Sequence, residues 1–370
     1  MKNTFGNNVS LTLFGESHGE AIGVVIDGLC AGIEVDDSFI KSQLAKRRPS
    51  GKTDTPRVEM DEYRIVSGVY NGKTTGTPIG IIIPNANTKS KDYQYGPARP
   101  SHADYVAFKK YDGNEDYRGG GHFSGRVTVG LVCAGAILIQ ALNRLGIKIG
   151  THILSCGSVN DTSFSLESAQ VEKEIDKLNS RECGSIPVLG NVEDAIYNEI
   201  IKAQSEKDSI GGKLQTAIVG MPQGVGEPWF DTVEGLLSHA LFSIGGVKGV
   251  EFGAGFDFAD MHGSVANDQL ALDENGQVVT KTNNNGGING GITNGMPIVF
   301  NCAIKPTPSI GKKQSTVDFL KNQEVDIEIK GRHDPAIIRR ASVVVDSISA
   351  LVMCDLLATE YGTKVFVKGL

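Results

Sequence analysis

Two long apolar segments constrain this fold more than any other feature of the sequence. Residues Arg126–Leu145 (RVTVGLVCAGAILIQALNRL) are apolar nearly all the way round a helix, and a second apolar run, Ile338–Glu360, follows Pro335. A helix that is apolar on every face is stable only when every face is buried. We therefore expect two helices that are enclosed by other layers of structure.

Most of the remaining regular structure is predicted to be strand. Apolar residues alternate in or near period two in several segments that turn residues bound, which is typical of strands. These segments are Val9–Phe14, Ile22–Leu29, Tyr63–Tyr70, Ile79–Pro84, Leu214–Met221 and Pro297–Ile304. Further helices are predicted over Asp36–Lys46, Ser165–Asn179, Val192–Glu206 and Val233–Ser243. Strands and helices do not alternate regularly, so a doubly wound parallel sheet is not favoured. We expect a single domain over residues 1–370, with helices buried between sheets.

Composition and charge narrow the class of protein. The chain has 370 residues, of which 40% are hydrophobic and 21% charged, as in an ordinary soluble globular protein. Its net charge of −7 does not favour a nucleic-acid partner, although basic residues that cluster locally can still bind an anion. The N-terminus lacks the apolar core of a signal peptide, and no run of about 18 apolar residues is evident that could span a bilayer. We therefore expect a cytoplasmic protein with no membrane partner.

Four segments place titratable side chains beside glycine or proline. They are Gly15–Gly19 (GESHG), Arg99–Asp104 (RPSHAD), Tyr117–Arg126 (YRGGGHFSGR) and Gly331–Pro335 (GRHDP). Glycine lets the backbone approach a ligand closely, and loops of this kind often carry function. The segments predict one site, rich in histidine and arginine and assembled from distant parts of the chain, for acid–base chemistry on an anion.

His18 and His102 are the candidate acid–base residues. A histidine exchanges protons near neutral pH, and Asp104 stands two residues after His102, where it could orient the ring. The alternative is that each is a turn histidine bonded to the backbone. The histidines lack the local spacing of a metal site, so no metal is expected.

Several arginines are candidates for binding the anion. Arg126 and Arg340 lie at the starts of the two apolar helices, where a cation opposes the helix dipole unless it binds an anion. Arg47 and Arg48 end a predicted helix, so they could equally be solvated side chains that suit the dipole there.

Two further loops are suited to a phosphate. Lys305–Ser309 (KPTPS) offers a lysine and two hydroxyl groups in a loop that proline stiffens. The alternative is that this segment is an ordinary turn. Gly119–Gly121 exposes backbone N–H groups before the first apolar helix. This triple glycine matches neither a Walker A loop nor a dinucleotide-binding fingerprint.

Taken in order, these motifs resemble those of the chorismate synthase family from Asn7 to about Leu357. The matching stretches are GESHGEAIGVVIDG (15–28), RRP (47–49), SGVYNGKTTGTPIG (67–80), RPSHADY (99–105), DYRGGG (116–121), GVGEPWFD (224–231), VKGVEFGAGF (247–256), GGINGGIT (286–293), KPTPS (305–309) and KGRHDP (330–335). The resemblance implies an α+β fold, a layered sandwich with helices packed between antiparallel β-sheets. It also implies a homotetramer.

The resemblance implies a carbon–oxygen lyase of aromatic biosynthesis. Its reaction would be the anti 1,4-elimination of phosphate from 5-enolpyruvylshikimate 3-phosphate to give chorismate. Reduced FMN would be required with no net redox change, and NADPH would serve only as a source of reducing equivalents. Because no added reductase domain is evident, an external flavin reductant is expected. The two carboxylates and the phosphate of the substrate account for the arginines, and proton-assisted phosphate loss accounts for the histidines.

The resemblance also assigns roles to individual residues. His18 would protonate or hold the reduced flavin, His102 would be the general acid near the leaving phosphate, and Asp334 would help flavin N5 act as a base. The substrate-binding positions are Arg47, Arg48, Arg126 and Arg340, and Arg47 is also the family position for NADP. The FMN-binding positions are His122, Phe123, Ser124, Gly245, Gly246, Gly290, Lys305, Pro306, Thr307, Pro308, Ser309 and Arg332. His122 replaces a usual arginine, and Gly245-Gly246 replaces a usual Asn-Ala pair.

Three alternatives stay open at this point. The chain could bind a phosphate ester without catalysis, which would leave His18, His102 and Asp334 without a role. It could be a conventional flavin oxidoreductase, although no dinucleotide fingerprint supports a tightly held nicotinamide. Asp334 could simply cap the helix Ile338–Glu360.

Overall fold

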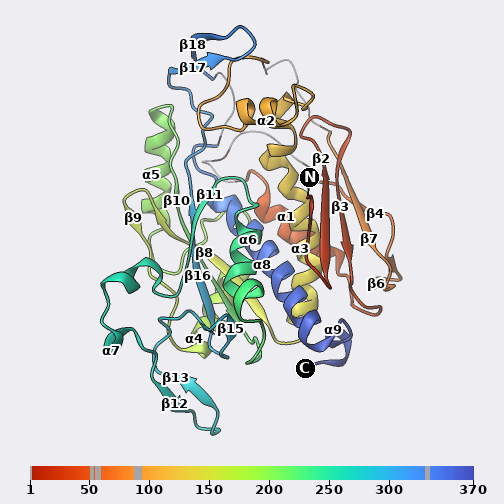
Figure 1. Ribbon diagram of the computed structural model, residues 1–370, viewed down its shortest axis with the longest axis vertical. Coiled ribbons are helices and arrows are strands. Elements are labelled where there is room, and N and C mark those ends of the chain that lie inside the picture. Colours follow the sequence, from red (N-terminus) through yellow and green to blue (C-terminus); the bar gives the residue numbers. More distant parts are fainter. Residues whose placement is uncertain (1, 51–53, 55–59, 87–93, 330–333) are drawn as a thin grey trace.

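The computed structural model describes residues 2–50, 54, 60–86, 94–329 and 334–370, and its sheets and helices are stacked in layers (Figure 1). One outer layer is an antiparallel sheet in the order β1-β2-β3-β7-β4. Its strands are β1 (Thr4–Phe5), β2 (Ser10–Gly15), β3 (Ala21–Asp27), β7 (Ile79–Pro84) and β4 (Arg64–Ile65). Along β7, Ile79, Ile81 and Ile83 are buried, so alternate side chains of this strand face the core.

A second antiparallel sheet has the order β11-β16-β10-β8-β9. Its strands are β11 (Val247–Phe252), β16 (Ile298–Ile304), β10 (Gly212–Val219), β8 (Lys148–Cys156) and β9 (Val159–Asn160). The sequence prediction missed β8 and β11. Helices pack against β8 from both sides, so nearly all its residues are buried and the alternation of a half-buried strand is absent.

Helices fill the space between the two sheets (Figure 1). They are α1 (Asp37–Arg47), α3 (Thr128–Asn143), α6 (Val233–Leu241) and α8 (Ile338–Tyr361). α3 packs on β3 and β7, whereas α8 packs on β8 and β10. The two helices cross closely at Gly135, where an added Cβ would lie 2.2 Å from the Cβ of Ser347. The prediction of two apolar helices buried between sheets is confirmed, and the fold is α+β.

The other elements lie outside this central sandwich or connect its layers. α4 (Ser168–Asn179) and α5 (Glu193–Ser205) cover the second sheet on its outer side. The short helices are α2 (Asp104–Lys110), α7 (Gly263–Ala266), α9 (Val365–Lys368), η2 (Arg118–Phe123), η3 (Gly125–Val127), η4 (Trp229–Asp231) and η5 (Gly255–Asp260). The hairpins are β5 (Val69–Tyr70) with β6 (Lys73–Thr74), β12 (Leu270–Leu272) with β13 (Val278–Thr280), β14 (Ile288–Asn289) with β15 (Ile292–Thr293), and β17 (Gln314–Asp318) with β18 (Gln323–Ile327).

Two expectations from the sequence are wrong. The run Tyr63–Tyr70 is not one strand, because it is divided into β4 and β5 at Gly68, which has a φ of +80°. The chain also contains two helices, Gly125–Asn143 and Ile338–Tyr361, that are long and apolar enough to cross a bilayer. Their apolar windows are 78% and 100% buried inside the fold, which accounts for their composition as core helices.

Candidate active site

The triple-glycine loop lies between the two candidate acid–base histidines. Gly119, Gly120 and Gly121 have φ values of 62°, 83° and 54°, which residues other than glycine rarely adopt. An added Cβ at Gly119 would lie 2.2 Å from Cε1 of His18, and one at Gly120 would lie 3.3 Å from Cε1 of His102. The loop therefore brings together two residues that are far apart in the sequence, as predicted.

The same loop is tied to the end of β2. The backbone N–H of Ser17 donates to the carbonyl of Gly121 at 3.0 Å. Nδ1 of His122 is 2.8 Å from the carbonyl oxygen of Gly15, so this nitrogen carries the proton and donates it. Phe123 is half-exposed beside it, and Ser124 caps η3 by accepting from the N–H of Arg126. The predicted cofactor segment His122–Ser124 thus adjoins the segment that carries His18.

His102 is oriented by an ion pair at the start of α2. Its Nδ1 lies 2.7 Å from Oδ1 of Asp104, and Arg99 donates to both carboxylate oxygens, Nε at 2.8 Å and Nη2 at 2.7 Å. Burial raises the pKa of Asp104, but the hydrogen bonds from Arg99 and His102 outweigh it and hold that pKa well below its usual range. Because an ionised carboxylate only accepts, Nδ1 is the donor. Nε2 is therefore the nitrogen that can exchange a proton with a ligand.

The Lys305–Ser309 loop lies beside His102. Nζ of Lys305 donates to the carbonyl of Ser101 at 2.6 Å, and Nη1 of Arg99 donates to Oγ of Ser309 at 3.4 Å. Gly246 joins the same group, because its carbonyl accepts from the N–H of Lys305 at 2.9 Å. Burial, followed by the charge of Lys248, lowers the pKa of Lys305. Several predicted cofactor positions are thus next to the predicted general acid.

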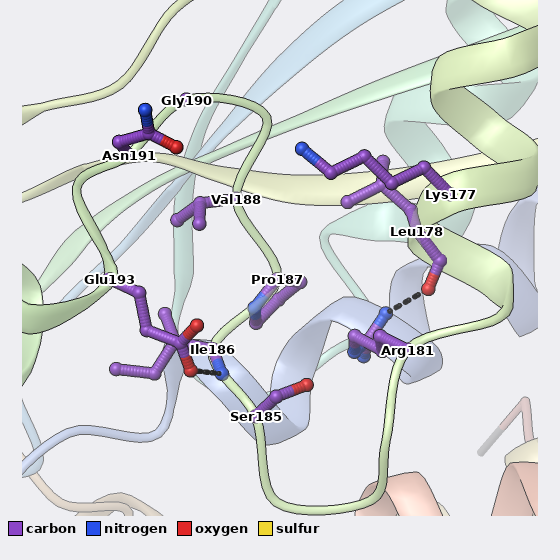
Figure 2. A pocket seen from close by; sticks show the side chains of 10 residues that line it. All are labelled: Lys177, Leu178, Arg181, Ser185, Ile186, Pro187, Val188, Gly190, Asn191 and Glu193. Carbon is purple, nitrogen blue, oxygen red and sulfur yellow. Dashed lines mark hydrogen bonds between the residues drawn. The ribbon is translucent and has the colours of Figure 1, made fainter.

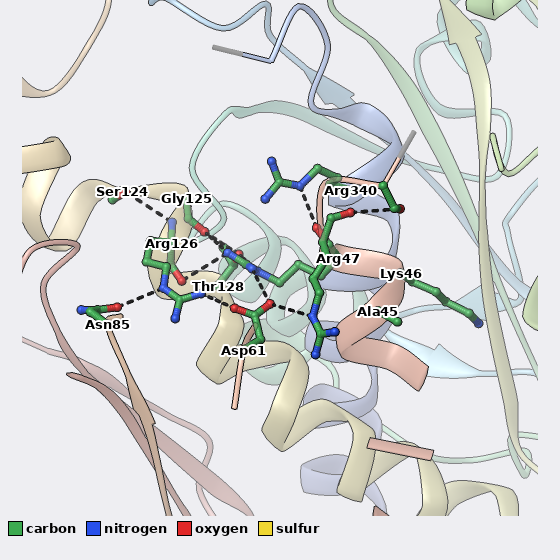
Figure 3. Close-up of polar contacts among 12 residues, drawn as sticks. Ala45, Lys46, Arg47, Asp61, Asn85, Ser124, Gly125, Arg126, Thr128 and Arg340 are labelled. Carbon is green, nitrogen blue, oxygen red and sulfur yellow. Dashed lines mark hydrogen bonds and ion pairs between the residues drawn. The ribbon is translucent and has the colours of Figure 1, made fainter. Parts of the chain in front are cut away.

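Asp61 organises the predicted substrate-binding arginines (Figure 3). Arg47 donates from Nη1 to Oδ2 of Asp61 at 3.2 Å, and Nε of Arg48 lies 3.6 Å from the same oxygen. Nη1 of Arg126 donates to Oδ1. The anion expected at the start of the first apolar helix is therefore, in the folded chain, the carboxylate of Asp61.

Arg340 joins this cluster to Asp334. Nε of Arg340 donates to the carbonyl of Arg47 at 2.7 Å (Figure 3). Nη1 of Arg340 donates to Oδ2 of Asp334. α8 has Ile337 at its N-cap position, without a side-chain cap. The alternative role of Asp334 as the cap of this helix is therefore wrong, and its carboxylate belongs to the arginine group.

The remaining predicted positions are less closely connected. Gly245 is open, since an added Cβ there would meet nothing within 4 Å. Gly290 lies at the turn between β14 and β15, and within the described part of the chain no hydrogen bond joins it to the histidine loops. Arg332 lies outside the described residues, as does the neighbouring His333.

A separate cavity of about 270 Å³ lies away from these residues, beside α4 and the start of α5 (Figure 2). The basic side chains that line this cavity form hydrogen bonds with other groups of the protein. Arg181 donates to the carbonyl of Leu178 and to Oγ of Ser342, each at 3.2 Å, and Lys177 donates to the carbonyl of Leu189 at 2.7 Å. None of the predicted site residues lines it, so we do not place the chemistry there.

Sequence reasoning missed Asp61, which the structure places at the centre of the cluster. A buried arginine needs an anionic partner, so the sequence indicated that some carboxylate lies near these arginines. The sequence could not identify which one, because the chain has 43 acidic residues.

Comparison with known proteins places this arrangement in a family. The family model described as chorismate synthase matches residues 9–358. The chain belongs to the chorismate synthase family. It is 45% identical to the chorismate synthase of Methanobrevibacter smithii, with 96% of each chain covered. It is 43% identical to that of Lachnoclostridium phytofermentans, with 99% of this chain and 98% of the relative covered.

A solved structure agrees with this assignment. The chain superimposes on a crystal structure of chorismate synthase with a TM-score of 0.76 at 28% identity, over 97% of this chain and 94% of the other. The resemblance inferred from the motifs is thus confirmed for the family and for the fold.

Proposed function

We propose that this chain catalyses the anti 1,4-elimination of phosphate from 5-enolpyruvylshikimate 3-phosphate, which yields chorismate. The observation that carries the proposal is the convergence of His18, His102 and the arginine cluster on one group of loops in a chain of the chorismate synthase family. Asn85 joins the two parts, because it donates to the carbonyls of Glu16 and Gly19, next to His18, and accepts from Nε of Arg126. The reaction is a carbon–oxygen lyase step. It requires reduced FMN without net redox change, and NADPH serves only to supply reducing equivalents.

His102 is proposed as the general acid for the leaving phosphate. Asp104 accepts from Nδ1 and orients the ring, while Nε2 gives its proton to the phosphate oxygen. Arg47, Arg48, Arg126 and Arg340 form the positive site for the substrate's carboxylates and phosphate. Arg47 is also the family position for NADP. Its side chain is only 2% exposed, so it is better placed to add positive charge to the substrate site than to contact a nicotinamide.

The chain's residues fit a bound FMN. Lys305 supplies a cation, and the buried Oγ1 of Thr307 has no hydrogen-bond partner within the described residues, so it can donate to a phosphate. His122–Ser124, Gly245, Gly246, Gly290 and Lys305–Ser309, with Pro306 and Pro308 stiffening the last loop, are the proposed contacts. Reduced flavin supplies electron density for C–O cleavage and a site for the departing hydrogen. His18 holds or protonates it, and Asp334 helps to position the proton acceptor.

An anaerobic assay tests the reaction. Wild-type protein, substrate and photoreduced FMN should release phosphate and form chorismate, both with and without NADPH. With oxidised FMN and NADPH alone, turnover should need an added reductant. Absence of chorismate with photoreduced FMN would refute the proposal. Stoichiometric oxidation of the flavin would instead favour a conventional flavin oxidoreductase.

His102→Ala tests the general acid within the same assay. Loss of a general acid should lower turnover by about 10²–10⁴, with a smaller change in substrate affinity. His262→Ala is the matched control, because this exposed histidine lies at the start of α7. Near-normal phosphate release by His102→Ala in a single turnover would exclude the role.

We also propose a homotetramer in the cytoplasm, built from a single domain over residues 1–370. One buried core cluster, which runs from Val9 to Phe366, supports a single folding unit. Trp229 and Phe230 are 84% and 94% exposed, which is unusual for large apolar side chains and is typical of an interface. Sedimentation equilibrium should give the tetramer for wild type and a smaller species for a Trp229→Ala, Phe230→Ala double variant. A wild-type monomer would contradict the assembly.

A further inference from the structure

Asp61 is a buried carboxylate surrounded by three arginines. Its side chain has no exposed surface, while the side chains of Arg47, Arg126 and Arg48 are 2%, 6% and 31% exposed. Three neighbouring guanidinium groups repel one another, and burial weakens the screening of that repulsion by solvent. One enclosed carboxylate makes the arrangement stable and leaves a net positive charge of two from these groups.

The hydrogen bonds divide the arginines into two kinds (Figure 3). Besides Asp61, Arg47 donates from Nε to Oγ1 of Thr128 at 3.1 Å and from Nη2 to the carbonyl of Gly125 at 3.2 Å. Arg126 donates from Nε to Oδ1 of Asn85 at 3.0 Å and from Nη2 to the carbonyl of Pro84 at 3.3 Å. Both guanidinium groups thus direct their N–H groups toward the protein.

The other two arginines are held at the edge of this buried pair. Arg48 is the most exposed of the three that surround Asp61, and it approaches the carboxylate through Nε. Arg340 is attached through the backbone carbonyl of Arg47, to which it donates at 2.7 Å. The position of Arg48 therefore depends on Asp61 directly, whereas Arg340 is held by the backbone of Arg47 and by Asp334.

We propose that Asp61 is a positioning residue for the substrate's anionic groups, an inference that rests on the proposed function. Its carboxylate holds the guanidinium groups of Arg47 and Arg126 in fixed positions, as a positively charged pair. Asp61 also sets the position of Arg48, which contacts the substrate together with Arg340. Asp61 itself contacts neither substrate nor flavin.

The effect of Asp61→Asn on substrate affinity distinguishes a role in setting the local charge from a role in positioning the arginines. Removing one negative charge raises the local positive charge, so on electrostatic grounds alone an anionic substrate should bind more tightly. Loss of the charge-assisted hydrogen bonds instead displaces the guanidinium groups, and a displacement of about 1 Å can cost roughly 10²-fold in rate. Weaker binding in Asp61→Asn therefore identifies positioning.

The experiment measures binding and turnover separately. Calorimetry without flavin gives the Kd of 5-enolpyruvylshikimate 3-phosphate, and the anaerobic assay gives kcat/KM. Asp61→Asn should raise Kd by roughly tenfold and lower kcat/KM by roughly 10²-fold. Asp61→Glu, which keeps the charge but shifts the carboxylate by one methylene, should also lower kcat/KM.

Asp355→Asn is the matched control. Asp355 is 3% exposed on α8 and accepts from the backbone N–H groups of Asn8 and Val9, so its loss lowers stability without touching the arginines. It should leave Kd and kcat/KM near wild type.

Unchanged or tighter substrate binding by folded Asp61→Asn would overturn the inference. If that variant does not fold, a wild-type Kd and kcat/KM for Asp61→Glu would overturn it instead. If wild type forms no chorismate, the proposed function fails, and the calorimetric comparison still decides the role of Asp61.

Discussion

Gly119 lies directly against the imidazole of His18. An added Cβ at this glycine would lie 2.2 Å from both Nδ1 and Cε1 of the ring, a separation that non-bonded atoms do not reach. The φ of Gly119 is +62°, which disfavours any side chain before packing is considered. The glycine therefore fixes the distance between the backbone of the loop and the ring.

Gly119→Ala should move His18, which we propose holds or protonates the flavin, and should lower turnover by roughly 10–10²-fold, because small displacements of such a group carry large costs in rate. Gly263→Ala is the matched control, since this exposed glycine lies at the start of α7 and a Cβ there would meet nothing within 4 Å. Both variants should be assayed at saturating substrate, with folding checked by circular dichroism. Equal rates for the two alanine variants would show that the contact with His18 has no part in the reaction.

Asp104→Asn should reduce turnover and change the acid stability of the protein. The amide can no longer hold Nδ1 of His102 as a strong donor, so the ring loses its preferred tautomer. The pKa of Asp104 is lowered in the folded state, so the unfolded chain takes up the proton first as the pH falls. Its contribution to stability is therefore complete above about pH 5 and is lost progressively below it.

Chemical unfolding at several pH values checks this expectation. Wild type should lose more free energy of unfolding than Asp104→Asn between about pH 5 and pH 2. Parallel pH profiles for the two proteins would contradict the ion pair with Arg99.

Substrate binding should weaken as salt is added, because an acidic protein is expected to hold an anion through a local cluster of arginines. Arg126→Ala and Arg340→Ala should weaken binding further and flatten its dependence on salt. Lys41→Ala is a suitable control, since this lysine is paired with Asp37 on an exposed part of α1. Calorimetric dissociation constants that are unchanged in both arginine variants would exclude the cluster as the anion site.

Asp334→Asn should slow C–H cleavage while FMN and substrate still bind. Its carboxylate pairs with Arg340 and does not cap α8, so asparagine keeps the size but removes the charge. Pro335 restricts the backbone of Asp334 and helps to direct its side chain. The check is the rate with substrate deuterated at the departing hydrogen. A wild-type rate with an unchanged isotope effect would leave Asp334 only its structural pairing with Arg340.

The local elements were largely predictable from the sequence. The helix predicted over Asp36–Lys46 is α1, which Asp36 caps by accepting from the N–H of Ser38. β7 alternates as a half-buried strand does, and α3 is buried nearly all round. β8 was missed because it is covered on both sides, which removes the pattern on which the prediction depends.

The sequence by itself determined the residue types of the site, namely histidine, arginine and lysine beside glycine and proline, together with the family and the two enclosed helices. It could not determine which groups pair. Asp61, Arg47 and Arg126 meet through contacts between residues up to 79 positions apart, as in the bond from Arg47 to the carbonyl of Arg126. Ion pairing depends on distance in space, and only the packing of α1 against α3 brings these charges within reach of one carboxylate.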